Sequence, residues 1–529
     1  MSTFRALASF VLTAALALAA PRPAVAQVPG GAPAIPPSAA SPTTPLGPPL
    51  QLSMERAVEM ALESNLGLEA NRLAVDDASL AIATARASFI PQLFSSVSRV
   101  SARNVPSDFT QGVVDITNQN VQVSSQLNQV LPFFGTNYQL NWNNTRNTQQ
   151  GGNPLFNPSL RSNFSFNLSQ PLWRGFLTDQ NRANYVTAQR QRLNADVELQ
   201  RRVTLLEAQV RNAYLNLISA IQGLRVAEQN LEIVQTSLAN ARARVEVGAA
   251  APIELISAEA DVANNQERVL LAQAQISTAE DFLRTLVLDP ERTDYWQVHL
   301  VPTDTIQAEP REIDLPATIS TALRERLDLA IVKRNIEIED LQLRASRDAT
   351  RPGVSANLSY AASGSGGTLL RYGNDGFPPP VLSTEEKSFG SVLNDTFGNA
   401  YPTWSVGVSV NYPIGRSAQE ANYARAEVAR RQSALQLREL ELAIVQQVRD
   451  AARQVENTYQ RVLVTRAALR ASEQQLEAEQ RRFQAGLATT FELQGRQSQL
   501  AQARVNELQA AIDYNRALIQ FERVQKTGQ

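Results

Sequence analysis

The sequence predicts a mainly α-helical fold that also contains transmembrane β-strands, and three observations support this class. The same order of helix, strands, long helix, break and helix occurs twice along the 529 residues, which indicates an internal repeat of about 240 residues. Apolar residues follow a heptad spacing over long stretches of both copies, as in coiled coils. Short segments between the helices alternate strictly between apolar and polar residues, as β-strands do.

The N-terminal residues have the features of an export signal followed by a tether. Arg5 precedes an apolar run, and Ala24 and Ala26 flank a cleavage site before Gln27, so residues 1–26 are predicted to be a secretory signal peptide. Residues 27–49 are rich in Pro, Ala, Gly and Ser, which predicts a disordered linker. Since no later apolar run reaches the length of a transmembrane helix, the mature chain can meet a membrane only through strands or an interfacial surface.

Composition and motifs exclude several classes of function. A formal charge of -2 and a pI near 5.9 provide no basic surface for nucleic acid. The chain has no cysteine, which excludes disulfides, thiolate metal sites, cysteine nucleophiles and a lipidated N-terminal cysteine. Its single histidine, His299, has no plausible catalytic triad, and there is no phosphate loop, dinucleotide fingerprint or metal-ligand cluster. We therefore expect no enzymatic activity, no cofactor and no metal site.

The two repeats can be aligned residue by residue. The segment from Ala61 to Leu93 aligns without a gap with the segment from Ala322 to Val354, which places Pro91 opposite Pro352. The first repeat is predicted at 50–287, with helices at 52–90, strands within 91–173, and long helices at 178–247 and 252–287. Residues 288–316 connect it to the second repeat at 317–526, with helices at 317–351, strands within 352–413, and long helices at 417–485 and 488–526.

The first long helix of each repeat carries a coiled-coil seam. From Val203 to Val245, apolar residues recur at alternating spacings of 3 and 4 without a polar interruption. The second repeat keeps apolar residues from Ile444 to Phe483, but polar residues occupy the alternate positions Thr458, Thr465, Ser472 and Glu479. Its seam is therefore predicted to be narrower and more polar. Read from Asn184 to Val247 at 1.5 Å per residue, the first helix would be roughly 95 Å long.

The alternating segments have the character of membrane strands. The segment from Thr403 to Pro413 places Trp404, Val406, Val408 and further apolar residues on one face, and Ser, Gly and Asn on the other. A half-buried soluble sheet would also alternate. The polar face is almost without charge, aromatic residues lie near the strand ends and an export signal precedes the strands, and together these favour a membrane barrel. One chain has too few strands to close a barrel, so closure requires several copies.

The strand regions of the two repeats differ. Pro171 lies 80 positions after Pro91, whereas Pro413 lies 61 positions after Pro352. The longer region has two extra strand-like runs, Val121 to Leu131 and Tyr138 to Asn143, which either join the barrel wall or form a hairpin outside it. Residues 364–400, with their Gly, Ser, Asp and Pro content, are predicted to be mostly an extracellular loop.

Several motifs carry a family resemblance. The helix LSMERAVEMALESNLGLEANR (52–72), the strand exits SQPLWRG (169–175) and NYPIGR (411–416), and the twin breaks VGAAAPIEL and AGLATTFEL resemble the TolC-like outer-membrane efflux protein family. The resemblance implies a homotrimer with one shared outer-membrane β-barrel that continues into a periplasmic α-helical barrel, with residues 288–316 at its equator. Two strands per repeat, twelve per trimer, is the family norm; the extra pair would give eighteen.

The function implied by the resemblance is passive export. The trimer would dock a periplasmic adaptor protein and an inner-membrane pump of the RND or ABC type, for efflux of small molecules or for type I secretion. An exported coiled-coil scaffold or adhesin without a pore is the alternative.

The resemblance also places both helix breaks at the periplasmic tip. It assigns the tip turns and the adaptor contact to Gly248, Pro252, Gly486 and Leu487. A glycine suits a left-handed helix end, and Pro252 suits the first turn of the next helix, although every helical hairpin needs such a turn.

Three further residues are candidates for the channel entrance. Copies of Glu254 and Glu492 would form acidic rings that favour cations; alternatively, each is a first-turn glutamate stabilised by the helix dipole. Phe483 stands where the family commonly has a gate tyrosine, and we expect it to close the tip by packing.

Overall fold

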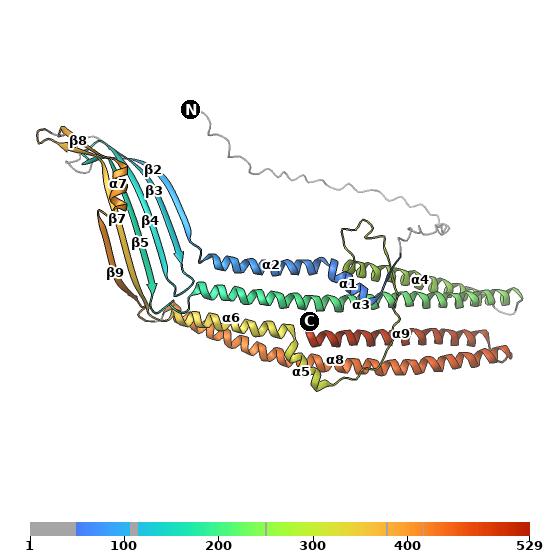
Figure 1. Ribbon diagram of the computed structural model, residues 1–529. Coiled ribbons are helices and arrows are strands. Elements are labelled where there is room, and N and C mark those ends of the chain that lie inside the picture. The colour runs from blue at the N-terminus through green and yellow to red at the C-terminus, as the bar shows by residue number, and fades with distance from the viewer. Residues whose placement is uncertain (1–48, 106–114, 249–250, 377–378, 416, 529) are drawn as a thin grey trace, which may run out of the picture. The chain divides into compact units, whose positions relative to one another are not determined.

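The computed structural model describes residues 49–105, 115–248, 251–376, 379–415 and 417–528. The predicted signal peptide, and the predicted linker up to residue 48, lie outside these residues. The described part of the chain is mainly helical, with one large sheet and one small sheet (Figure 1). None of its helices is both long enough and apolar enough to cross a membrane.

Two long helical hairpins make up most of the helical part. Helix α3 (Gln180–Glu246) pairs with α4 (Pro252–Val287), and α8 (Ala418–Gln484) pairs with α9 (Thr490–Lys526) (Figure 1). The predicted seam residues of α3 are all buried or half-buried, and Val210 is fully buried. In α8 the polar seam residues Thr458 and Glu479 are buried as well. The heptad pattern therefore identifies the packed side of both helices, including the positions that are polar.

Shorter helices flank these hairpins. They are α1 (Met54–Ser64), α2 (Leu66–Ala87), α5 (Leu315–Glu325) and α6 (Leu327–Ala349). Helix α2 packs on α3, and α6 packs on both α3 and α8. Ser53 caps the start of α1, while Asn65 ends α1 and caps α2 with its side chain. These caps divide the predicted helical range 52–90 into two helices, α1 and α2. The first begins at Met54 instead of residue 52, because Leu52 lies in a strand.

The small sheet ties the N-terminal segment to the predicted equatorial segment. Strand β1 (Pro49–Leu52) pairs in parallel with β6 (His299–Pro302). The buried Tyr214 hydroxyl donates to the Leu52 carbonyl at 2.8 Å, and burial raises the pKa of Tyr214 to about 12. Neither strand was predicted from the sequence, because a strand of four residues is too short to show an alternation.

The large sheet is antiparallel and has seven strands. In the order of pairing, β2, β3, β4, β5 and β7 lie side by side; β9 then pairs with the half of β7 nearer its start, and β8 with the other half. Their bounds are β2 (Gln92–Asn104), β3 (Ile116–Val130), β4 (Asn137–Gln150), β5 (Phe156–Pro171), β7 (Gly353–Tyr372), β8 (Val381–Lys387) and β9 (Pro402–Asn411). The two extra runs of the first repeat are β3 and β4, and both lie within the sheet.

The prediction of a loop over most of residues 364–400 is wrong. Strand β7 continues to Tyr372, and it is followed by β8 and by helix α7 (Phe389–Phe397). The Gly and Ser residues that indicated a loop lie instead in a strand that another element approaches closely. A Cβ on Gly366 would lie 2.6 Å from a methyl carbon of Val392 in α7, so these glycines serve packing rather than a turn.

Candidate functional site

One face of the large sheet is mainly apolar, although it also carries Arg99 and Arg146, which lie level with each other on β2 and β4. One row of paired residues crosses all the strands from β2 to β9 on this face, and it consists of Leu93, Leu127, Leu140, Phe166, Tyr360 and Trp404. Along β9 the same face presents Val406, Val408 and Val410, each more than two-thirds exposed in the single chain. So large an exposed apolar surface marks contact with lipid or with a partner.

The opposite face of the sheet is polar and almost free of charge. The neighbouring row of paired residues on this face consists of Gln92, Asn128, Gln139, Asn167, Ser359 and Ser405. Side chains on this face are linked to each other: Ser359 donates to Asn167 at 2.8 Å, and Asn357 donates to Ser409 at 2.9 Å. Neutral amides and hydroxyls of this kind suit contact with water, so the two faces are suited to different surroundings.

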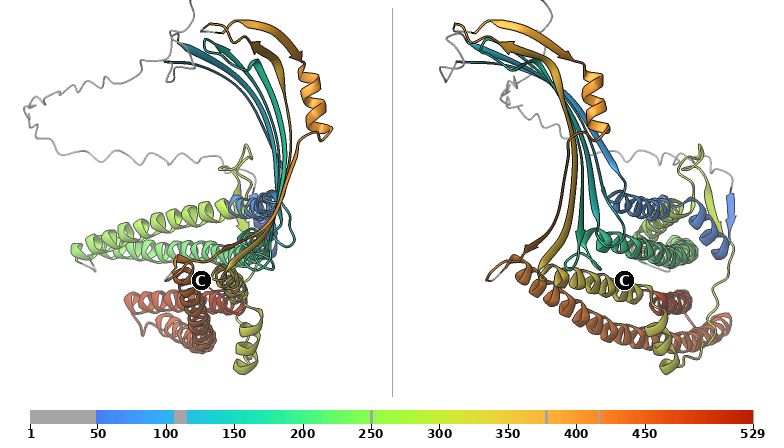
Figure 2. Two further views of the ribbon diagram at one scale, coloured as in Figure 1. Left: turned by 90° about the vertical axis from the view of Figure 1, so that its left-hand side faces the viewer. Right: turned by 60° about the vertical axis from the view of Figure 1, so that its left-hand side comes forward.

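Helix α7 lies on the apolar face of the sheet, which is the convex side of its curve in Figure 2. The helix packs directly on Gly364 and Gly366 of β7. A Cβ on Gly364 would overlap the Val392 carbonyl and lie 2.7 Å from the Thr396 hydroxyl. Phe397 packs against Trp142 and Phe164, with ring centroids 5.9 and 6.1 Å away. Phe397 itself is 61% exposed, so the apolar surface continues over the helix where the strands beneath carry small residues.

The two edges of the sheet are open. In the described chain β2 forms one edge and pairs with β3 alone, and the other edge is formed by β9 and then β8, each of which pairs with β7 alone. Every residue of β9 is exposed. An open, exposed edge is a template for pairing with another chain. The sheet therefore has two unsatisfied edges as well as two contrasting faces.

Both predicted tip glycines end a long helix in the left-handed conformation. Gly248 has a φ of 74° after α3, and Gly486 has a φ of 72° after α8. At the second turn, Gly486 N–H donates to the Phe483 carbonyl at 3.0 Å and Leu487 N–H donates to the Arg482 carbonyl at 2.8 Å. This pair of bonds is the Schellman motif, which satisfies carbonyls at the helix end. Pro252 is the first residue of α4, as its sequence position suggested.

The two predicted entrance glutamates both lie in the first turn of a helix. Glu492 forms a capping box with Thr489, whose backbone N–H and hydroxyl donate to its carboxylate at 2.7 and 2.9 Å. These hydrogen bonds hold the pKa of Glu492 below its ordinary value. The Glu254 carboxylate lies 3.8 Å from a guanidinium nitrogen of Arg244, which is near the end of α3 before the break. Both positions fit the helix-terminus interpretation, and the acidic rings would require further copies of the chain.

The ends of the two hairpins expose apolar side chains. Phe483 is 40% exposed and Leu487 is 70% exposed. Ile253, at 68%, and Phe491, at 82%, are also exposed there and were not among the predicted tip residues. They occupy equivalent places, each being the second residue of the helix that follows a break. An apolar residue repeated at such a place was a signal that could have identified them.

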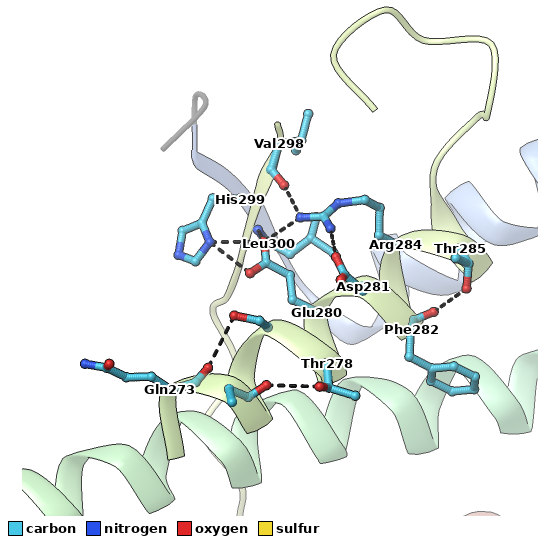
Figure 3. Close-up of polar contacts among 12 residues, drawn as sticks. Gln273, Thr278, Glu280, Asp281, Phe282, Arg284, Thr285, Val298, His299 and Leu300 are labelled. Carbon is cyan, nitrogen blue, oxygen red and sulfur yellow. Dashed lines mark hydrogen bonds and ion pairs between the residues drawn. The ribbon is translucent and has the colours of Figure 1, made fainter. Parts of the chain in front are cut away.

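The only histidine belongs to a buried polar cluster where α4 meets β6, shown in Figure 3. Arg284 donates to Glu280 at 3.0 Å and to the Val298 carbonyl at 2.7 Å. The Glu280 carboxylate also accepts from Leu300 N–H at 2.8 Å and lies 3.0 Å from His299 Nδ1. These contacts fix the predicted equatorial segment to α4. Nowhere in the described residues do three His, Cys, Asp or Glu side chains gather so that they could hold a metal ion.

The chain matches known proteins over most of its length. The Outer membrane efflux protein family matches residues 114–287 and 318–524. A relative, outer membrane efflux protein BepC of Brucella suis biovar 1 (strain 1330), is 22% identical over 438 residues, which cover 82% of this chain and 84% of BepC.

Solved structures share the fold. A membrane protein from Pseudomonas aeruginosa has a TM-score of 0.63 at 18% identity, over 89% of this chain and 93% of that protein. The Campylobacter jejuni CmeC outer membrane channel has a TM-score of 0.62 at 15% identity, over 89% of this chain and 85% of CmeC. The match to the family covers well over half of the sequence, and the fold agrees with it: this chain belongs to the outer membrane efflux protein family.

Proposed function

We propose that three copies of this chain form a passive export channel in the outer membrane, reached through an N-terminal signal peptide at residues 1–26. The observation that carries the proposal is the sheet, which has an apolar convex face, a neutral polar concave face and two open edges. Pairing of β9 of one copy with β2 of the next would satisfy both edges and close a barrel, since only a closed barrel leaves no strand edge in lipid.

In the closed barrel each face of the sheet would meet the medium that its side chains suit. The convex face, with the row from Leu93 to Trp404 and with α7, would contact lipid. The concave face would enclose water, and its amides and hydroxyls would let hydrated solutes pass without strong selection by charge. The helical hairpins would continue the conduit into the periplasm as a tube of helices.

The hairpin ends would form the periplasmic entrance. We propose that the exposed apolar residues there, Ile253, Leu487 and Phe491, contact an adaptor protein, together with the turns at Gly248, Pro252 and Gly486. Rings of Glu254 and Glu492 would favour cations at the entrance, and Phe483 would narrow it by packing. The driving force would come from an inner-membrane pump of the RND or ABC type, exporting small molecules or a secreted protein.

Membrane fractionation with native mass analysis tests this proposal against the scaffold alternative. We expect the full chain to be extracted from outer-membrane fractions only by detergent, and to have three times the mass of the chain in that detergent. Release by salt or osmotic shock would contradict the channel and favour an exported coiled-coil scaffold or adhesin. A monomer in detergent that still resists salt would contradict the shared barrel.

A further inference from the structure

The hairpin formed by β3 and β4 is built into the sheet along its whole length. Strand β3 pairs with β2 from Ile116 to Asn128, and β4 pairs with β5 from Asn137 to Asn147. The hairpin therefore separates β2 from β5, two strands that would otherwise be neighbours. A section across the sheet cuts β2, β3, β4, β5, β7 and then β9 or β8, which makes six strands both where β9 pairs with β7 and where β8 does; only at residues 363–366 of β7 does neither strand pair with it.

The turn of this hairpin is anchored on both sides. The Phe134 ring stacks on Phe176 at 4.9 Å between centroids, and Gln170 donates to the Phe134 carbonyl at 3.0 Å. On the other side, Gln129 donates to the Phe89 carbonyl at 2.9 Å, just after α2. Phe89 lies in the connection from α2 to β2, and Phe176 lies in the connection from β5 to α3. The hairpin is thus fastened to the helical part of the chain and is not a flap at the sheet edge.

The side chains of β3 and β4 follow the two faces of their neighbours without a change of phase. Val123, Leu127, Leu140 and Trp142 lie on the apolar face, level with residues of β2 and β5. The residues between them, such as Gln126 and Asn141, lie on the polar face, while Ser125 beside Trp142 and Asn144 beside Val123 are polar residues on the apolar face. A hairpin folded outside a barrel wall, or into its lumen, would have no reason to continue both patterns, because a shift by one residue would reverse every side chain.

We infer that this hairpin widens the barrel, so that the assembled channel has eighteen strands and a mouth much wider than its four other strands per chain could form. The inference rests on the proposed trimer: three copies of six strands give eighteen, and three copies of four would give twelve. With a strand spacing of about 4.8 Å and a tilt of about 40°, the backbone diameter is about 36 Å for eighteen strands and about 24 Å for twelve. The barrel would then be the wide part of the channel, and the size limit on export would lie at the periplasmic tip.

The pairing register supplies a deletion that tests the inference. Arg103 on β2 pairs with Thr117 on β3, and Thr117 pairs with Gln150 on β4, so Arg103 and Gln150 lie level on the same face. Removing residues 104–150 joins Arg103 directly to Gly151, which follows Gln150. Strand β2 can then take the place of β4 beside β5, with the turn after it retained and Leu93 facing Phe166 as Leu140 does in the full chain.

Electron cryo-microscopy of the full chain and of the deletion variant, purified in detergent as intact assemblies, measures the barrel directly. We expect eighteen strands in the full chain and twelve in the variant, with the barrel diameter reduced to about two-thirds. A full-length trimer whose barrel has twelve strands, with β3 and β4 outside the wall, would overturn this inference and leave the export channel intact. A full chain that forms no closed barrel would instead contradict the proposed function. If the variant does not assemble, the strand number of the full chain decides.

Thiol labelling supplies a second measurement on the full-length chain, which has no cysteine of its own. Leu140 and Asn141 are neighbours on β4 and face opposite sides of the sheet. In outer-membrane vesicles, Asn141→Cys should react with a membrane-impermeant maleimide at least tenfold faster than Leu140→Cys, because the first faces water and the second faces lipid. Equal rates at the two positions would show that the hairpin lies outside the wall and would overturn the inference.

Discussion

The strongest quantitative prediction concerns neighbouring residues of β9 that face opposite sides. Val408 lies on the apolar face, midway between Trp404 and Tyr412, and Gly407 lies on the polar face. Trp404 and Tyr412 are eight positions apart, which is about 27 Å along a strand and about 21 Å across a bilayer at a tilt of 40°. That distance is close to the apolar band of about 25 Å in outer-membrane barrels, so Val408 would sit near the bilayer midplane.

Val408→Arg should therefore lower the free energy of unfolding by about 2–4 kcal/mol per chain, the cost of a lipid-facing arginine at the midplane. This cost equals about 30- to 700-fold in the folding equilibrium constant. Gly407→Arg is the matched control, because a Cβ there meets nothing within 4 Å and the side chain would enter water. We expect the control to change stability by no more than about 0.5 kcal/mol.

The assay is denaturant-dependent folding into phospholipid vesicles, followed by tryptophan fluorescence. A Gly407→Arg variant that is destabilised as strongly as Val408→Arg, or more strongly, would refute the assignment of the two faces. In ion-selectivity measurements the control should also move the channel toward anions, since each chain would add a positive charge to the lumen.

Three more predictions concern the helices. Gly486→Val should lower the thermal midpoint, because a φ of 72° costs a β-branched residue about 1–2 kcal/mol; Gly223→Ala, inside α3 with open space around its Cβ, should not lower it. Glu492→Gln should lower the thermal midpoint at pH 7, because hydrogen bonds from Thr489 hold the pKa of Glu492 below its ordinary value when folded. The stabilisation is present above the unfolded pKa and is lost as the pH falls through the folded one, so the difference between the two proteins should shrink as the pH is lowered; a difference that stays constant or grows on acidification would contradict this. Glu280→Ala should lower the free energy of unfolding in a denaturant titration by about 3 kcal/mol, because it removes the buried carboxylate beside Arg284, leaving only the more exposed Asp281, and takes away the acceptor of Leu300 N–H. An effect no larger than that of exposed Glu267→Ala on the same helix would show that the cluster is not needed.

Long periodic segments were predictable from the sequence. The heptad spacing from Val203 to Val245 identified the packed side of α3, and Gly248 and Pro252 marked the turn that follows. Both signals act within one element, so they do not depend on the rest of the fold. The alternation in β9 was equally clear, because all its large apolar residues face one side of the sheet.

Features that depend on contacts between distant segments were not predictable in the same way. Gly364 and Gly366 indicated a loop, yet they lie in a strand because α7, more than twenty residues later, packs on them. The position of β3 and β4 stayed open for the same reason: only the pairing with β2 and β5 decides whether a hairpin enters a sheet. The pairing of β1 with β6 joins segments slightly more than the length of a repeat apart.

The central claim, that this chain forms an open-edged sheet that closes into a channel, is tested most directly by single-channel recording. The detergent-purified protein would be inserted into planar bilayers, and wild type would be compared with Glu254→Gln. We expect discrete conductance steps that favour cations, with weaker cation selectivity in the variant. No steps from a well-folded protein that has inserted into the bilayer would contradict the channel itself, whereas steps of unchanged selectivity would contradict only the role of Glu254 at the entrance.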